Sequence, residues 1–197
     1  MKQIIDPEYD FEKVSRDLAK YGFQLTGVDY IEDEAPMGIE ELVLTVLKDE
    51  NPYPRHISGL ITALNNGEVD YQRLHNLSVS NNIQNRTGWI LETLATLLRL
   101  HEQREPANLI NAIKKLEDVM LPDETALDSG FDFKKHSEFV DSRRGPIERK
   151  WKIMALFKLE YFQEHFLLYH SDLELNRKRK LISEAVYPGD PRYPEHA

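Results

Sequence analysis

Hydrophobic residues recur along this chain mostly at the spacing of amphipathic helices. The segment 38–49 is the clearest case, because its apolar residues fall on one helical face: Ile39, Leu42, Val43, Val46 and Leu47. The same spacing predicts further helices over 10–21, 56–64, 70–77, 81–100, 106–120, 155–169 and 172–186. Alternation of apolar and polar residues predicts short strands at 23–31 and 147–153. We therefore expect a mainly α protein with a small β component (α+β), a compact helical domain with a few short strands.

The pattern divides the chain into three parts. Residues 1–37 contain a short helix and strand, residues 38–170 a helical core with a C-terminal strand, and residues 171–197 a polar helix and a proline-rich tail. Any internal domain boundary is expected between Leu100 and Pro106, where the helical pattern is interrupted.

Composition narrows the classes of function. The 197 residues include no cysteine, which excludes disulfides, thiol catalysis and zinc–cysteine sites and is compatible with a reducing cytosol. The N-terminus lacks the pattern of a signal peptide, and no apolar run approaches the 18 residues that suggest a membrane span. We therefore expect a cytoplasmic protein without a membrane partner. The net charge of −9 argues against general nucleic-acid binding but allows a local basic patch.

The stretch NNIQNRTGWILETL (81–94) places a glycine inside a helical pattern. Glycine costs roughly 1 kcal/mol there relative to alanine, so a compensating role is expected. In one interpretation, Gly88 lets a crossing helix approach closely, with Trp89 and Leu91 packed beside it. In the other, three polar side chains face outward and bind an anion or a partner: Asn82, Asn85 and Arg86.

The residues Arg86-Thr87-Gly88-Trp89-Ile90-Leu91-Glu92 follow an Arg-x-Gly-aromatic-hydrophobic-Leu-Glu pattern at the start of a leucine-rich helix. This pattern resembles the C-terminal region of the AbiEi family, the antitoxins of type IV toxin–antitoxin (abortive infection) systems. The segments GIEELVLTVL (38–47) and SGLITAL (58–64) are similar to two helices that precede it in the family. GPIERKWKI (145–153) is similar to the strand that follows, so the resemblance covers roughly residues 36–153.

The resemblance implies a non-enzymatic regulatory or interaction protein of phage defence, which counteracts a nucleotidyltransferase-type toxin in the cytoplasm without a cofactor. Family members usually begin with a winged helix-turn-helix, and residues 1–37 are too few for a complete one. The residues we expect to bind a cognate toxin, another protein or nucleic acid are Asn85, Arg86 and Lys150, with Arg143 and Arg144 as a possible basic contact.

A second hypothesis is a Mg²⁺-dependent nuclease of the PD-(D/E)xK type. Pro122-Asp123 and Glu148-Arg149-Lys150 have the form of that motif. Two carboxylates would hold Mg²⁺, and the lysine would orient or activate the attacking water. On a strand, Glu148 and Lys150 would share one face. The alternative interpretation of the same residues is a turn followed by a solvated strand face.

A third hypothesis is a helical DNA-binding transcriptional regulator without enzyme activity. The run Arg177-Lys178-Arg179-Lys180, together with Arg143 and Arg144, could form a local patch that touches phosphate or an acidic partner. The same run also fits a solvated helix end, where the macrodipole favours cations. The seven histidines show no metal-ligand spacing, so no metal site is predicted.

Overall fold

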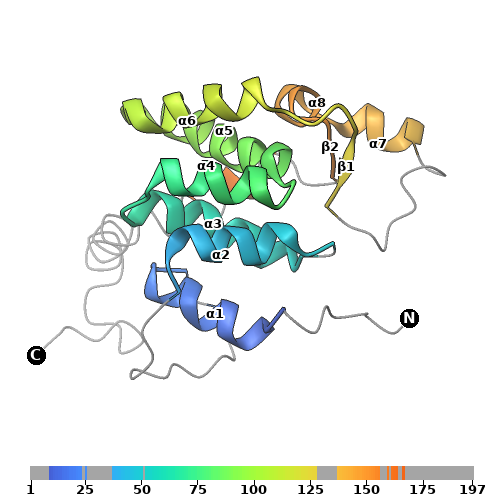
Figure 1. Ribbon diagram of the computed structural model, residues 1–197. Coiled ribbons are helices and arrows are strands. Elements are labelled where there is room, and N and C mark those ends of the chain that lie inside the picture. The colour runs from blue at the N-terminus through green and yellow to red at the C-terminus, as the bar shows by residue number, and fades with distance from the viewer. Residues whose placement is uncertain are drawn as a thin grey trace, which may run out of the picture.

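The computed structural model describes residues 9–23, 25, 37–50, 52–127, 137–155, 159, 161–163 and 166. Over these residues the predicted mainly α fold with a small β component is confirmed. The elements follow one another as α1 (Phe11–Lys20), α2 (Ile39–Lys48), α3 (Pro54–Asn66), α4 (Tyr71–Ser80), α5 (Gln84–Leu100), α6 (Ala107–Asp118), β1 (Thr125–Ala126), α7 (Ser137–Arg143), α8 (Pro146–Lys150) and β2 (Ile153–Met154). Figure 1 shows them stacked from α1 at the bottom, through α2 and α3, to α6 at the top.

Local sequence signals explain where several helices begin. Asp10 caps α1 by accepting a hydrogen bond from the Lys13 backbone N–H, and Asp70 caps α4 in the same way. Pro54 occupies the first turn of α3, where its missing N–H removes no helical hydrogen bond. These caps place the helices within a few residues of the boundaries that the periodicity predicted.

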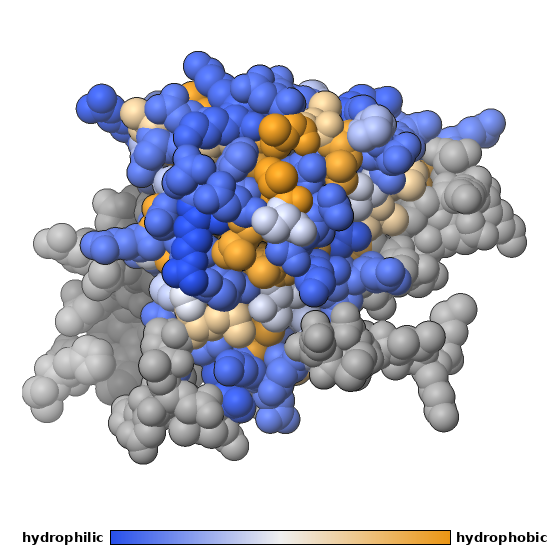
Figure 2. Space-filling view, viewed as in Figure 1, coloured by the Kyte–Doolittle hydropathy of each residue, from blue (hydrophilic) through white to orange (hydrophobic). Residues whose placement is uncertain are grey.

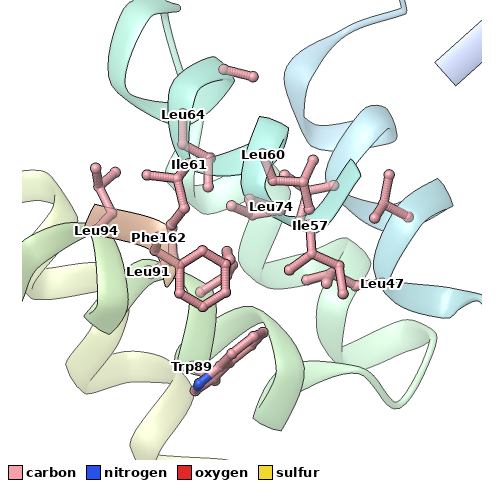
Figure 3. Close-up of a cluster of buried hydrophobic side chains, with 14 of the residues drawn as sticks. Leu47, Ile57, Leu60, Ile61, Leu64, Leu74, Trp89, Leu91, Leu94 and Phe162 are labelled. Carbon is pink, nitrogen blue, oxygen red and sulfur yellow. The ribbon is translucent and has the colours of Figure 1, made fainter. Parts of the chain in front are cut away.

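α5 forms the centre of the core, and it packs against α2, α3, α4, α6 and α8. Most of its residues are buried, on every side of the helix, as expected for a helix in the middle of a domain. Figure 3 shows Leu91 and Leu94 of α5 on the side of the leucines and isoleucines of α3, and Trp89 beside the ring of Phe162. α6 packs closely along α5, so the turn between Leu100 and Pro106 connects two helices that are packed against each other.

The predicted helix over 81–100 begins later than expected. α4 continues to Ser80, and Asn82 adopts a left-handed backbone conformation with φ of 56°. Asparagine tolerates this conformation better than most residues, which makes it suited to the turn between two helices. α5 then begins at Gln84.

The predicted strand over 147–153 was wrong. Residues Pro146–Lys150 form the short helix α8, and only Ile153–Met154 form a strand, which pairs in parallel with Thr125–Ala126. Pro146 favours a helix start, and the apolar pair Ile147 and Trp151 has the i, i+4 spacing of one helical face as well as strand alternation. The predicted strand at 23–31 lies largely outside the described residues, as does most of the predicted helix at 155–169; residues 171–197 lie outside them entirely.

Candidate functional site at the first turn of α5

The first two polar residues of α5 hold the chain that follows α6. Gln84 Nε2 donates to the backbone oxygen of Val119 at 3.2 Å. Asn85 pairs with both backbone groups of Leu121, since its Oδ1 accepts from the N–H at 2.8 Å and its Nδ2 donates to the oxygen at 3.2 Å. A side-chain amide carries one acceptor and a donor group in a plane, so it can replace a neighbouring strand as the partner of a backbone.

Arg86, the next residue, joins three elements through backbone oxygens. Its Nη1 donates to Leu47 at 2.6 Å and to Asp49 at 2.7 Å, and its Nη2 donates to Ala126 at 2.6 Å. Leu47 lies in the last turn of α2, where carbonyls lack helical partners and the helix dipole favours a cation. Burial lowers the pKa of Arg86, against the opposing charges of Glu50 and Asp49, but a guanidinium remains charged in proteins.

The prediction that Asn85 and Arg86 face outward was therefore wrong. Asn85 is 1% exposed and Arg86 is 9% exposed, and their polar groups are engaged by the protein's own backbone. Asn82, the third residue of that prediction, is exposed in the turn before α5, so it alone of the three faces outward. The polar residues of this turn satisfy loop and helix-end backbone groups that would otherwise be buried without partners.

Gly88 is in close contact with Trp151. A Cβ built on Gly88 would fall on the six-membered ring of Trp151, whose side chain is completely buried. The close approach predicted for Gly88 is thus present. It is made by a tryptophan ring just after α8 rather than by the backbone of a crossing helix.

Two tryptophan–glutamate hydrogen bonds join α5 to α8 and the residue after it. Trp89 Nε1 donates to Glu148 Oε1 at 3.0 Å, and Trp151 Nε1 donates to Glu92 Oε2. These reciprocal bonds fix α8 against α5 and satisfy the polar atoms of two buried tryptophans.

Lys150 belongs to the same group of charges. Its Nζ lies 2.8 Å from Glu92 Oε2 and 3.4 Å from Glu117 Oε2, and 5.4 Å from the ring centre of Trp151. Partial burial lowers the pKa of Lys150, but the hydrogen bond and charge of Glu92, with those of Glu117, outweigh this effect and leave the pKa above its usual value. Lys150 is therefore a cation that already has two carboxylate partners.

The geometry expected for a nuclease is not present. Glu148 and Lys150 lie two residues apart on a helix, so they point to nearly opposite sides instead of sharing a strand face. Glu148 is 6% exposed and accepts from Trp89, while Asp123 lies in the bend before β1. Within the described ranges, no group of three or more histidine or acidic residues could hold a metal ion.

Arg144, one of the two arginines predicted to form a basic contact, is paired with carboxylates of the protein itself. Arg144 Nη1 lies 2.6 Å from Glu124 and 3.1 Å from Asp141, and its side chain is only 6% exposed. Arg143 is the last residue of α7, and its side chain lies outside the described residues, as does the run 177–180. Of the predicted basic residues whose side chains are described, Arg144 and Lys150 are both engaged by internal carboxylates.

The sequence did not indicate a buried chain of hydrogen bonds between α1 and α3. Tyr9 hydroxyl contacts His56 Nδ1, and Ser15 Oγ lies 2.7 Å from His56 Nε2. Burial lowers the pKa of His56 to about 4, so the ring is neutral at pH 7, and burial raises the pKa of Tyr9, so its hydroxyl keeps its proton. No local motif could reveal this cluster, because its members are 41 and 47 residues apart.

The direction of these hydrogen bonds excludes serine activation. Ser15 uses its only proton to donate to the Phe11 backbone oxygen at 2.7 Å, so Ser15 Oγ accepts from His56 Nε2–H. Tyr9 then donates to the unprotonated Nδ1. A histidine that donates to the serine cannot act as its general base, so the cluster serves to attach α1 to α3.

No family model, curated protein or solved structure matches this chain. Within the part of the chain that the structure describes, no helix combines the length and the apolar character needed to cross a membrane.

Proposed function

We propose that this chain is a non-enzymatic, antitoxin-like interaction protein that counteracts a nucleotidyltransferase-type toxin. The observation that carries the proposal is the packing of the four segments that resemble the AbiEi family. They are 38–47, 58–64, 86–92 and 145–153, and they contribute to α2, α3, α5 and α8 with β2. α5 packs against each of the other three.

Specific contacts join these segments. Arg86 of the third segment bonds to Leu47, the last residue of the first segment. Gly88 gives space to Trp151 of the fourth, and Trp89 bonds to Glu148 in that same segment. These residues contact one another in the folded protein. Matching segments that pack together support a scaffold shared with the AbiEi family better than four unconnected short matches would.

The candidate catalytic residues Glu148 and Lys150 are bound to other side chains of the protein, which supports a role without catalysis. Glu148 accepts a hydrogen bond from Trp89, and Lys150 pairs with Glu92 and Glu117. The residues first expected to contact a partner also have internal roles, as shown by Arg86 and Arg144. We therefore assign partner binding to other surfaces of the same scaffold.

Co-expression tests the proposal directly. The nucleotidyltransferase encoded beside this gene is induced in a bacterial host with and without the chain, and growth is measured. We expect the chain to restore growth, and Arg55→Met to restore it equally, because Arg55 is exposed on α3. Persistent toxicity in the presence of folded, soluble chain would contradict the proposal, as would the absence of such a neighbouring gene.

A mobility-shift assay separates protein binding from DNA binding. The chain is titrated into duplex DNA from its own promoter at low and physiological salt. Under the antitoxin proposal, relief of toxicity does not depend on DNA binding. A salt-dependent shift without relief of toxicity would instead favour the DNA-binding regulator.

A further inference from the structure

A groove of about 320 Å³ lies between the start of α4 and one face of α6. α4 contributes Tyr71 and Gln72, and α6 contributes Asn108, Asn111 and Lys115. Figure 1 shows α6 lying above α4, and in Figure 2, seen from the same side, hydrophilic residues cover the left part of this face while hydrophobic ones gather nearer its centre. The volume lies at the lower end of the range usual for ligand sites.

Several polar groups of this groove are not used within the described part of the chain. The Asn111 side chain and the Tyr71 hydroxyl form no hydrogen bond there, and Asn108 uses only its Oδ1, which accepts from the Leu109 N–H at 3.0 Å. Donors and acceptors without a protein partner in a concave surface are available to a ligand.

The charges of the groove favour an acidic ligand group at one end. Lys115 Nζ bonds at 2.7 Å to the neutral Gln72 Oε1, and it forms no ion pair with a carboxylate among the described residues. The carboxylate of the groove, Asp70, is directed to the backbone, since its Oδ1 accepts from the N–H groups of Gln72 and Arg73. Asp70 is thus compensated by the start of α4, and Lys115 offers its charge to an acidic group at its own end of the groove.

The spacing on α6 suits an extended peptide. Asn111 and Lys115 are four residues apart, which corresponds to about 6 Å along a helix. Residues on the same side of an extended strand repeat at about 6.6 Å, which is close to that separation. Elsewhere in this molecule Asn85 already binds a peptide backbone with both groups of its amide, through Leu121.

We propose that this groove binds an extended peptide segment of a partner protein, with Asn111 pairing with the peptide backbone and Lys115 contacting an acidic side chain of the peptide. Asn108 and Tyr71 supply further hydrogen bonds, and Ala112 provides an apolar floor. The proposal does not depend on the identity of the partner named above, and it holds for a chain that is not an antitoxin.

The test uses the full chain and a phage-displayed library of random dodecapeptides. Peptides enriched on the immobilised chain over an albumin control are synthesised and titrated by fluorescence anisotropy. They are measured against the wild type, Asn111→Ala, Lys115→Ala and the control Lys114→Ala, which removes a neighbouring exposed lysine outside the groove. All three positions are exposed, so thermal unfolding of the variants should match the wild type.

We expect the enriched peptides to contain Asp or Glu. Their Kd should weaken about tenfold (about 1.4 kcal/mol) with Asn111→Ala and with Lys115→Ala, since each substitution removes a group that hydrogen-bonds to the peptide. Lys114→Ala should leave the Kd unchanged. The proposal is overturned if no peptide is enriched, if both groove variants bind like the wild type, or if Lys114→Ala weakens binding as much as Lys115→Ala.

Discussion

The indole ring of Trp151 lies against the backbone of Gly88, in the space where any other residue would carry its Cβ. This contact joins α8 to the central helix. It explains why a glycine, which costs roughly 1 kcal/mol relative to alanine in a helix interior, is present in α5.

Replacing Gly88 with alanine should destabilise the protein by about 2 kcal/mol. Overpacking typically costs about 1–3 kcal/mol, and a value near the upper end is expected because Trp151 has no exposed surface into which it could move. The gain in helix propensity offsets only roughly 1 kcal/mol of this cost. Urea unfolding followed by circular dichroism measures the difference.

The matched control is the same substitution in a Trp151→Leu background. Leucine leaves room beside residue 88, so Gly88→Ala should there be neutral or stabilising by up to about 1 kcal/mol. An equal loss in both backgrounds would show that Trp151 is not the reason for the glycine.

Arg86→Met should destabilise the protein by about 3 kcal/mol or more. Methionine fills part of the volume but leaves the buried backbone oxygens of Leu47, Asp49 and Ala126 without their donor. Arg55→Met is the control, since Arg55 is exposed and should change stability by less than about 0.5 kcal/mol. If Arg86→Met unfolds like the wild type but relieves toxicity less well, Arg86 would instead be a contact to the partner.

His56 should make the protein sensitive to mild acid. The unfolded histidine binds a proton near pH 6.5 and the folded one only near pH 4, so between these values the unfolded state holds more protons. The contribution of His56 to the free energy of unfolding is therefore fully present above pH 6.5 and is lost as the pH falls. The loss reaches about 3 kcal/mol near pH 4.

Urea unfolding of the wild type and His56→Gln between pH 4 and 8 isolates this effect from that of the carboxylates. Glutamine stays neutral and retains hydrogen-bonding groups for Tyr9 and Ser15. The variant should be less stable at pH 7, and the difference between the two proteins should shrink as the pH approaches 4. A difference that is independent of pH would show that His56 is not held neutral by burial.

Glu148 should behave as a structural acceptor. Glu148→Gln keeps an oxygen for the Trp89 indole N–H and should change stability by less than about 1 kcal/mol. Glu148→Ala leaves that N–H buried without a partner and should cost about 2 kcal/mol. Millimolar Mg²⁺ should not raise the Tm of any of these proteins. A Mg²⁺-dependent rise in the wild type that Glu148→Gln abolishes, together with DNA cleavage, would restore the nuclease hypothesis.

The helices from α1 to α6 follow from the sequence because their signals are local. Apolar spacing, Asp10 and Asp70 as caps and Pro54 in a first turn act within a few residues of one another. The segment 145–153 was misassigned because Ile147 and Trp151 fit both periods, and a short segment gives too few positions to distinguish them.

The sequence by itself determined the mainly helical class and identified Gly88 as a point of close approach. Only the tertiary structure decided the roles of the polar residues around it. Asn85 and Arg86 looked like an external binding site because polar residues at a helix start are usually solvated, but the chain after α6 covers them and supplies backbone partners. The physical reason is that hydrophobic periodicity is written along the chain, whereas the partner of a polar side chain depends on segments that only folding brings together.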